Sequence, residues 1–158
     1  MKIMNKLQNK LKKANKYNKG FSLVELIIVI AIMAILVGIV GTQVIPYIQK
    51  SKKAKDIQKI SALCTAATTA YSSNTATLTD ASYTITINAS GVSVASGTNK
   101  GTLESEFKTI SGVSNLKDVG LESKDGGLVT TITIVCENVA PMVEVTTDAG
   151  DFDPISSK

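Results

Sequence analysis

Histidine and arginine are both absent from this chain of 158 residues. Without histidine there is no Ser–His–Asp triad, no Cys–His nucleophile and no metal site built on imidazole. No group of acids, hydroxyls or thiols forms a paired catalytic constellation either. An enzyme is therefore the least expected class, and the sequence predicts no catalytic residue and no cofactor.

Acids are absent from the first twenty residues, which hold seven of the seventeen lysines. The other ten lysines stand against thirteen acids, so residues 21–158 carry a net charge of −3, and the overall charge of +4 comes from the N-terminal segment. A lysine run can bind phosphates, but this one directly precedes an apolar run, which is typical of the cytoplasmic flank of a membrane helix. We expect no nucleic-acid partner.

Charge is also missing from the next segment. From 26 to 40, fifteen consecutive residues have no charged or hydrogen-bonding side chain. The nineteen residues 23–41 would form a helix about 28 Å long, close to the roughly 30 Å hydrocarbon core of a bilayer. No convincing small-residue cleavage site follows, so the run differs from an ordinary secretory signal. We predict one membrane-spanning helix at 21–48.

A short motif joins a basic flank, a glycine, an aromatic residue and an acid directly before the apolar run: Lys19-Gly20-Phe21-Ser22-Leu23-Val24-Glu25. The motif resembles the N-terminal signature of the type IV pilin superfamily, and the resemblance covers about residues 19–60. It implies that a membrane aspartyl peptidase, the prepilin peptidase, cuts between Gly20 and Phe21. It further implies that Phe21 is then N-methylated and that residues 1–20 are a cleaved leader.

Glu25 is the one acid of the membrane segment. A charge at membrane depth costs on the order of 2.5–3.5 kcal/mol, so it needs a partner. Cleavage would expose an ammonium group on Phe21, and in a filament Glu25 would pair with the Phe21 ammonium of a neighbouring subunit. On this interpretation the charge has a partner only after the leader is cut. The alternative is a Glu25 that reaches the headgroups of a plain membrane anchor.

Helix-weakening residues follow at Gly38, Gly41 and Pro46. Glycine costs about 1 kcal/mol in a helix interior and proline about 3 kcal/mol. Members of the pilin superfamily commonly carry a proline where this chain has Thr42, so the weak zone is shifted here. We predict that 38–46 bends or unwinds when the subunit leaves the membrane. The alternative is that the two glycines permit close packing of helices.

Residues 49–73 are predicted to continue the helix as an amphipathic half. Apolar residues recur along one stripe at three- and four-residue steps: Ile57, Ile60, Cys64, Ala67 and Tyr71. Lysines crowd its start: Lys50, Lys52, Lys53, Lys55 and Lys59. These lysines would contact anionic headgroups, acids of a neighbouring subunit, or only solvent.

Residues 74–158 are predicted to form a small globular head. Strands are expected at 83–87, 92–94, 128–136 and 142–146, a short helix at 103–110, and turns at 88–91, 125–127 and 138–141. A segment of 85 residues is small, so the long helix must supply part of its core. The expected fold class is α+β, a long N-terminal helix packed on a small antiparallel sheet, and the resemblance implies the same pilin fold.

The two cysteines both fall on predicted core-facing positions, Cys64 on the helix stripe and Cys136 on a strand. They form either a disulfide, which would persist outside the cytoplasm, or two buried thiols. Many pilins have a disulfide that bounds a C-terminal loop, and this chain lacks that pattern because one of its cysteines lies in the helix.

Three acids cluster in the C-terminal tail, at Asp148, Asp151 and Asp153. Carboxylate oxygens are ligands that calcium prefers, and some secretion pseudopilins similarly bind calcium in a C-terminal loop. The alternative is an acidic terminus in contact with solvent, and we expect no metal.

The resemblance implies a structural subunit of a type IV pilus. Such a subunit is stored as a single-pass protein in the cytoplasmic membrane, with its N terminus inside and its head outside. It then polymerises through the helix into a surface filament used for adhesion, twitching motility or related tasks. Its expected partners are further copies of itself in a helical filament, the prepilin peptidase, and an assembly platform with its ATPase. A pseudopilin of a type II secretion or competence machine, and a non-polymerising membrane-anchored sensor or binding domain, are the alternatives.

Overall fold

The computed structural model describes Met4 and residues 20–95, 97–139 and 142–157. The predicted leader, residues 1–20, therefore lies outside the described residues except at Met4 and Gly20. Residues 140 and 141 of the predicted turn at 138–141 lie outside them too. The chain divides into two compact units, Met1–Ile45 and Pro46–Lys158, and each is described by itself.

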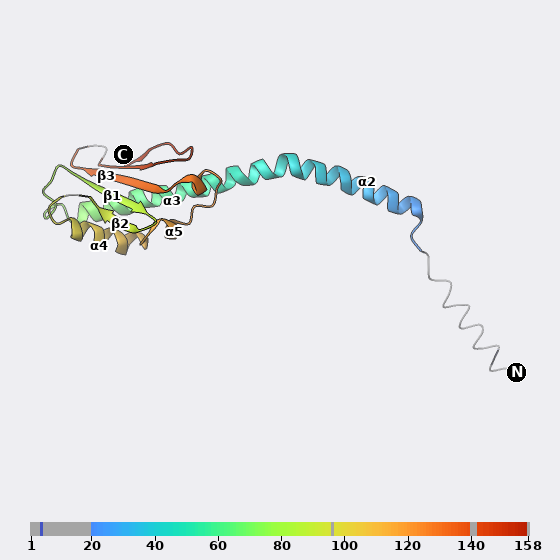
Figure 1. Ribbon diagram of the computed structural model, residues 1–158, viewed down its shortest axis with the longest axis horizontal. Coiled ribbons are helices and arrows are strands. Elements are labelled where there is room, and N and C mark those ends of the chain that lie inside the picture. The colour runs from blue at the N-terminus through green and yellow to red at the C-terminus, as the bar shows by residue number, and fades with distance from the viewer. Residues whose placement is uncertain (1–3, 5–19, 96, 140–141, 158) are drawn as a thin grey trace. The chain divides into compact units, whose positions relative to one another are not determined.

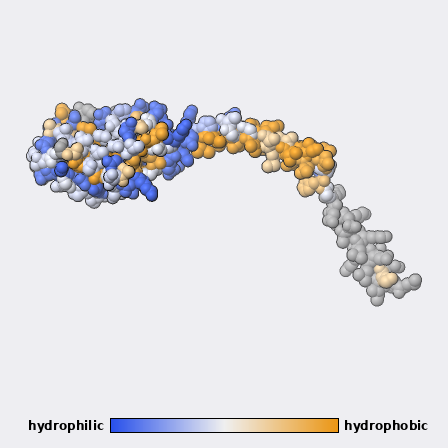
Figure 2. Space-filling view, in the orientation of Figure 1, coloured by the Kyte–Doolittle hydropathy of each residue, from blue (hydrophilic) through white to orange (hydrophobic). Residues whose placement is uncertain are grey.

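The first unit contains helix α2, Leu23–Ile39. Apart from Glu25 in its first turn, its side chains are apolar on every face, and none of its residues is buried. A helix that is hydrophobic all round belongs in a membrane or in a core made with other helices. Within the described part of the chain, one helical stretch, Leu23–Ser73, is long and apolar enough to cross a membrane by length and composition. Figure 2 shows the hydrophobic colouring of α2 giving way to hydrophilic colouring farther along the chain.

A π-helical turn, η1, occupies Val40–Val44 between α2 and α3. Helix α3 begins at Ile45, and its second residue is Pro46, which has no N–H to donate to the carbonyl four residues earlier. π-helical turns form where the regular backbone hydrogen-bond pattern of an α-helix is interrupted. The turn η1 lies inside the predicted weak zone 38–46. The Thr42 hydroxyl donates to the carbonyls of Gly38 (3.2 Å) and Ile39 (3.3 Å). Unwinding stays a prediction, and strong hydrogen-exchange protection throughout 38–46 in assembled filaments would argue against it.

Helix α3, Ile45–Ser73, provides one wall of the head's core. The predicted stripe is confirmed at four of its five positions, because Ile60, Cys64, Ala67 and Tyr71 are buried. The prediction was wrong for Ile57, which is 42% exposed. A helix turns by about 100° per residue, and the buried face runs instead through the preceding residue, Asp56.

The other wall is a five-stranded antiparallel sheet with the order β2-β1-β3-β4-β5. The strands are β1 Ser82–Asn88, β2 Gly91–Val94, β3 Thr131–Glu137, β4 Val143–Thr147 and β5 Ile155–Ser156. Along β1 and β3 buried residues alternate with partly exposed ones, which is the pattern that predicted half-buried strands. The sequence missed β5, whose two residues are too few to show a period.

The connection from β2 to β3 carries three short elements, α4 Lys100–Ser111, α5 Leu116–Val119 and the 3₁₀ turn η2 Gly126–Leu128 (Figure 1). The helix expected at 103–110 is confirmed as α4, which buries Leu103 and Phe107. The strand expected at 128–136 starts later, at Thr131, because η2 takes its first residue. The rings of Tyr71 on α3 and Tyr83 on β1 lie 6.1 Å apart between helix and sheet. The expected α+β class, a long helix packed on a small antiparallel sheet, is confirmed.

Candidate assembly site

The start of α2 holds the residues that the motif singles out. Phe21 is 89% exposed, and Gly20 lies next to it with no atom within 4 Å of where its Cβ would be. The Ser22 N–H donates a hydrogen bond of 2.8 Å to Oε2 of Glu25. A carboxylate three residues into a helix often satisfies the free N–H at its start, so Glu25 caps its own helix. Glu25 thus accepts a hydrogen bond from its own chain before any cleavage, and its pairing with a Phe21 ammonium stays a prediction.

The apolar side chains of α2 remain exposed along its whole length, from 72% at Leu23 to 48% at Ile39. Fully burying one such side chain contributes about 1.5–3 kcal/mol, so the unit needs a lipid or protein environment that covers it. Gly38 and Gly41 have no atom within 4 Å of their Cβ positions, so no contact within the described residues requires a glycine there. Close packing against another helix therefore stays a prediction for both glycines.

In the second unit, Lys53 of α3 fastens two loops of the head. Its Nζ lies 2.7 Å from Oδ2 of Asp151, 3.1 Å from Oδ2 of Asp125 and 5.7 Å from the centre of the Phe152 ring. The hydrogen bonds to Asp151 and then Asp125 raise the pKa of Lys53, and Lys53 in turn lowers the pKa of Asp151. Lys53 of the predicted lysine cluster therefore forms ion pairs with acids of its own head.

Lys59, a second lysine of that cluster, also contacts acceptors in its own head. Its Nζ lies 3.6 Å from Oε1 of Glu122 and also donates to the carbonyl of Gly120. Both acceptors lie in the segment between α5 and η2. Such partly exposed ion pairs contribute at most about 1 kcal/mol each, but they orient the side chains that make them.

Asp56 is a fully buried charge that the sequence interpretation missed. Its Oδ1 accepts the Glu122 N–H at 2.9 Å and its Oδ2 accepts the Ser123 N–H at 2.8 Å. A Cβ at Gly126 would lie 2.5 Å from Asp56 Oδ2, so only glycine fits beside this carboxylate. Asp56 stands four residues before Ile60, in line with the buried stripe, and this spacing could have indicated from the sequence that it is buried.

The environment of Asp56 affects its pKa in two opposing ways. Burial by itself raises the pKa of the carboxyl. Hydrogen bonds from the Ser123 side chain and from the backbone N–H groups of Glu122 and Ser123, together with the charge of Lys59, outweigh burial and bring the pKa below its ordinary value. Asp56 is therefore a structural anion that holds the loop around 122–126 against α3.

The three tail acids are not brought together. Oδ1 of Asp148 accepts the N–H groups of Thr130 (2.9 Å) and Thr131 (3.0 Å), while Asp151 pairs with Lys53 and Asp153 is exposed. Within residues 20–95, 97–139 and 142–157, no group of three or more acids, cysteines or histidines is placed to hold a metal ion. The geometry therefore gives no support to the calcium alternative.

Both cysteines are buried free thiols in the structure. The Cys64 thiol lies 3.9 Å from the carbonyl of Val143, the residue that pairs with Cys136 across β3 and β4. Burial raises the pKa of both thiols, that of Cys136 to about 12, with nearby Cys64 adding to the rise. At neutral pH the folded head therefore offers almost no thiolate for oxidation.

Alkylation of the unfolded, unreduced protein is accordingly expected to modify both Cys64 and Cys136, as detected by mass spectrometry. The control is the same alkylation after treatment with a reductant, which should give the same mass. Cysteines that become reactive only after reduction would show that a disulfide forms before the head closes.

Comparison with known proteins bears on the N-terminal unit. Residues 15–41 match the family described as the prokaryotic N-terminal methylation motif. Comparisons with curated proteins and with solved structures find no match. The matched residues cover the junction at Gly20 and Phe21, the capping residue Glu25 and the whole of α2. The chain therefore carries a prokaryotic N-terminal methylation motif that runs into α2.

Proposed function

We propose that this protein is the structural subunit of a type IV pilus, stored in the membrane through α2 and polymerised through the same helix into a surface filament. The observation that carries the proposal is the methylation motif at residues 15–41, which runs directly into a helix whose apolar side chains are exposed on every face. Lipid covers that surface in storage, and the α2 helices of other copies cover it in the filament. The role is assembly and not catalysis.

Processing follows from the motif. Prepilin peptidase acts at the Gly20–Phe21 bond on the cytoplasmic side, where the lysine-rich leader holds the N terminus. The head lies outside, and the assembly platform with its ATPase draws the mature subunit out of the membrane. The new Phe21 ammonium then pairs with Glu25 of a neighbouring subunit, in competition with the Ser22 N–H that caps it within its own chain.

A pseudopilin of a secretion or competence machine is the second candidate. It is supported by the same motif and the same exposed helix, which serve short filaments as well as long ones. The two candidates differ in the length and surface exposure of the polymer.

The test is to shear surface material from native cells, image it, and determine the N terminus of this protein. Phe21 as the first residue, carrying an added methyl group, in long sheared filaments is expected. Phe21 as the first residue in the membrane fraction alone would favour the pseudopilin. An uncut N terminus that retains residues 1–20 would overturn both and leave a plain membrane anchor.

A further inference from the structure

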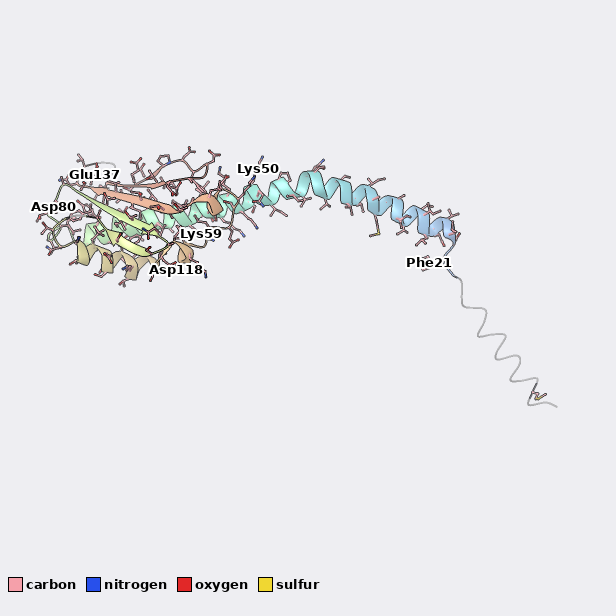
Figure 3. All side chains as sticks on the ribbon, viewed as in Figure 1. Phe21, Lys50, Lys59, Asp80, Asp118 and Glu137 are labelled. Atoms are coloured by element: carbon pink, nitrogen blue, oxygen red, sulfur yellow. The ribbon has the colours of Figure 1, made fainter. Side chains whose placement is uncertain are left out.

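The lysines at the start of α3 fall into two sets once their partners are known. Lys53 and Lys59 pair with acids of the head. No carboxylate of residues 20–95, 97–139 or 142–157 forms an ion pair with the other three, which are Lys50, Lys52 and Lys55. Lys50 and Lys55 are exposed and Lys52 is half-buried. We call these three residues the lysine collar, and Figure 3 labels Lys50 within it and Lys59 on the part of α3 that packs in the head.

The lysine collar surrounds the helix and does not form one face. At about 100° per residue, Lys52 is turned by about 200° from Lys50, and Lys55 by about 140°. Lys50 therefore points to the opposite side of α3 from the other two. A flat protein surface cannot contact all three at once, whereas lipid headgroups can reach a helix from more than one side.

The lysine collar lies close to the start of α3. The helix begins at Ile45, so Lys50 lies about 7.5 Å and Lys55 about 15 Å farther along its axis. The headgroup layer on each side of the hydrocarbon core is about 5–7 Å thick, so Lys50 is the collar lysine nearest to it, and the side chains of Lys52 and Lys55 would have to extend back along the helix to reach it. Tyr47, which is 75% exposed, lies between Ile45 and the first lysine, where aromatic residues gather at membrane interfaces.

We propose that the lysine collar binds the anionic phospholipid headgroups of the membrane that holds α2. Positive side chains near a negatively charged lipid surface each contribute a roughly fivefold preference for it, and the effect fades beyond about 10 Å at ordinary salt. Lipid composition would then set how firmly the stored subunit is held. The inference needs α2 in a membrane, but it does not need a filament.

The first test uses the full chain in nanodiscs of phosphatidylcholine alone or with about 30% phosphatidylglycerol. Acylation of each lysine is followed by mass spectrometry. Lys50 and Lys55 should react at least about threefold more slowly in the anionic discs, and high salt should remove the difference. Lys100 and Lys117, exposed on α4 and α5, should react equally in both. Equal rates for the lysine collar in the two lipids would overturn the proposal.

A matched pair of variants provides the second test. Lys50→Gln with Lys55→Gln removes two charges from the lysine collar, and Lys100→Gln with Lys117→Gln removes two from the head. The first pair should lower the phosphatidylglycerol retained during purification in mild detergent by about tenfold, and the second by less than about twofold. An equal effect of both pairs would show that net charge alone binds lipid and would overturn the proposal.

Two outcomes distinguish lipid binding from contact with a second copy and from the filament proposal. Protection of the lysine collar that appears in phosphatidylcholine and grows with protein density would assign these lysines to acids of a second copy, and would overturn lipid binding. Both assays use isolated subunits without assembly machinery, so a failed shearing experiment leaves their result unchanged. Conversely, acylation rates of the lysine collar that do not depend on the lipid would leave the filament proposal intact.

Discussion

The Glu25→Ala variant is expected to be cleaved and inserted in the membrane in ordinary amounts, yet to be absent from sheared filaments. Removing one partner from a buried charge pair costs about 3–5 kcal/mol, since the Phe21 ammonium of the neighbour is left unpaired. At about 1.4 kcal/mol per tenfold, this predicts at least a hundredfold loss of sheared protein. Immunoblots of sheared and membrane fractions measure both quantities.

A second variant separates charge pairing from helix capping, since Glu25 also accepts the Ser22 N–H. Losing the cap costs about 1 kcal/mol, which α2 tolerates within a membrane. Glu25→Gln keeps an oxygen for Ser22 but has no charge. If pairing with Phe21 drives assembly, Gln fails as Ala does. Filaments formed normally by Glu25→Gln but not by Glu25→Ala would show that capping is the important contact, and normal filaments from both would contradict the role of this residue.

The Asp56→Ala variant is expected to lower the free energy of unfolding of the head by roughly 3–5 kcal/mol, because a hydrogen bond to a charged group contributes about 1.5–3 kcal/mol and Asp56 accepts from two backbone donors. The melting temperature should fall by about 10–15 °C. Thermal unfolding of the full chain in detergent, followed by circular dichroism, measures the change. Asp153→Ala is the control, since Asp153 is exposed and should be replaceable at little cost.

This effect should depend on pH. The folded-state pKa of Asp56 is lowered, so its contribution is fully present above the unfolded value of about 3.9 and is lost as the pH falls through the lower folded value. The stability gap between the wild-type protein and Asp56→Ala should therefore be constant near neutral pH and narrow below about pH 4. A gap that stayed constant down to pH 2 would mean that the lost contacts do not involve the ionised carboxylate.

Sequence patterns predicted the elements that have a clear period or composition. The alternation of Thr and Ile through residues 84–87 predicted a half-buried strand, and the apolar run predicted α2. Patterns failed where a contact distant in sequence determines whether a residue is buried. Asp56 has the sequence context of a solvent-exposed helix residue, and only the N–H groups of Glu122 and Ser123 explain its burial. For the same reason, the lysine cluster appeared uniform although its members have different partners. Those partners lie far away in sequence, and only the fold brings them together.

The fastening of loops to α3 has a consequence for making a water-soluble form of the head. Deleting α2 removes the apolar surface, and the second compact unit begins at Pro46. Cutting farther in, beyond Asp56, would also remove the ammonium of Lys53 and the carboxylate that the loop around 122–126 needs. The shortest useful soluble head therefore starts before Gln49, whose side chain accepts the Lys124 N–H. The first turns of α3 belong, in folding terms, to the head.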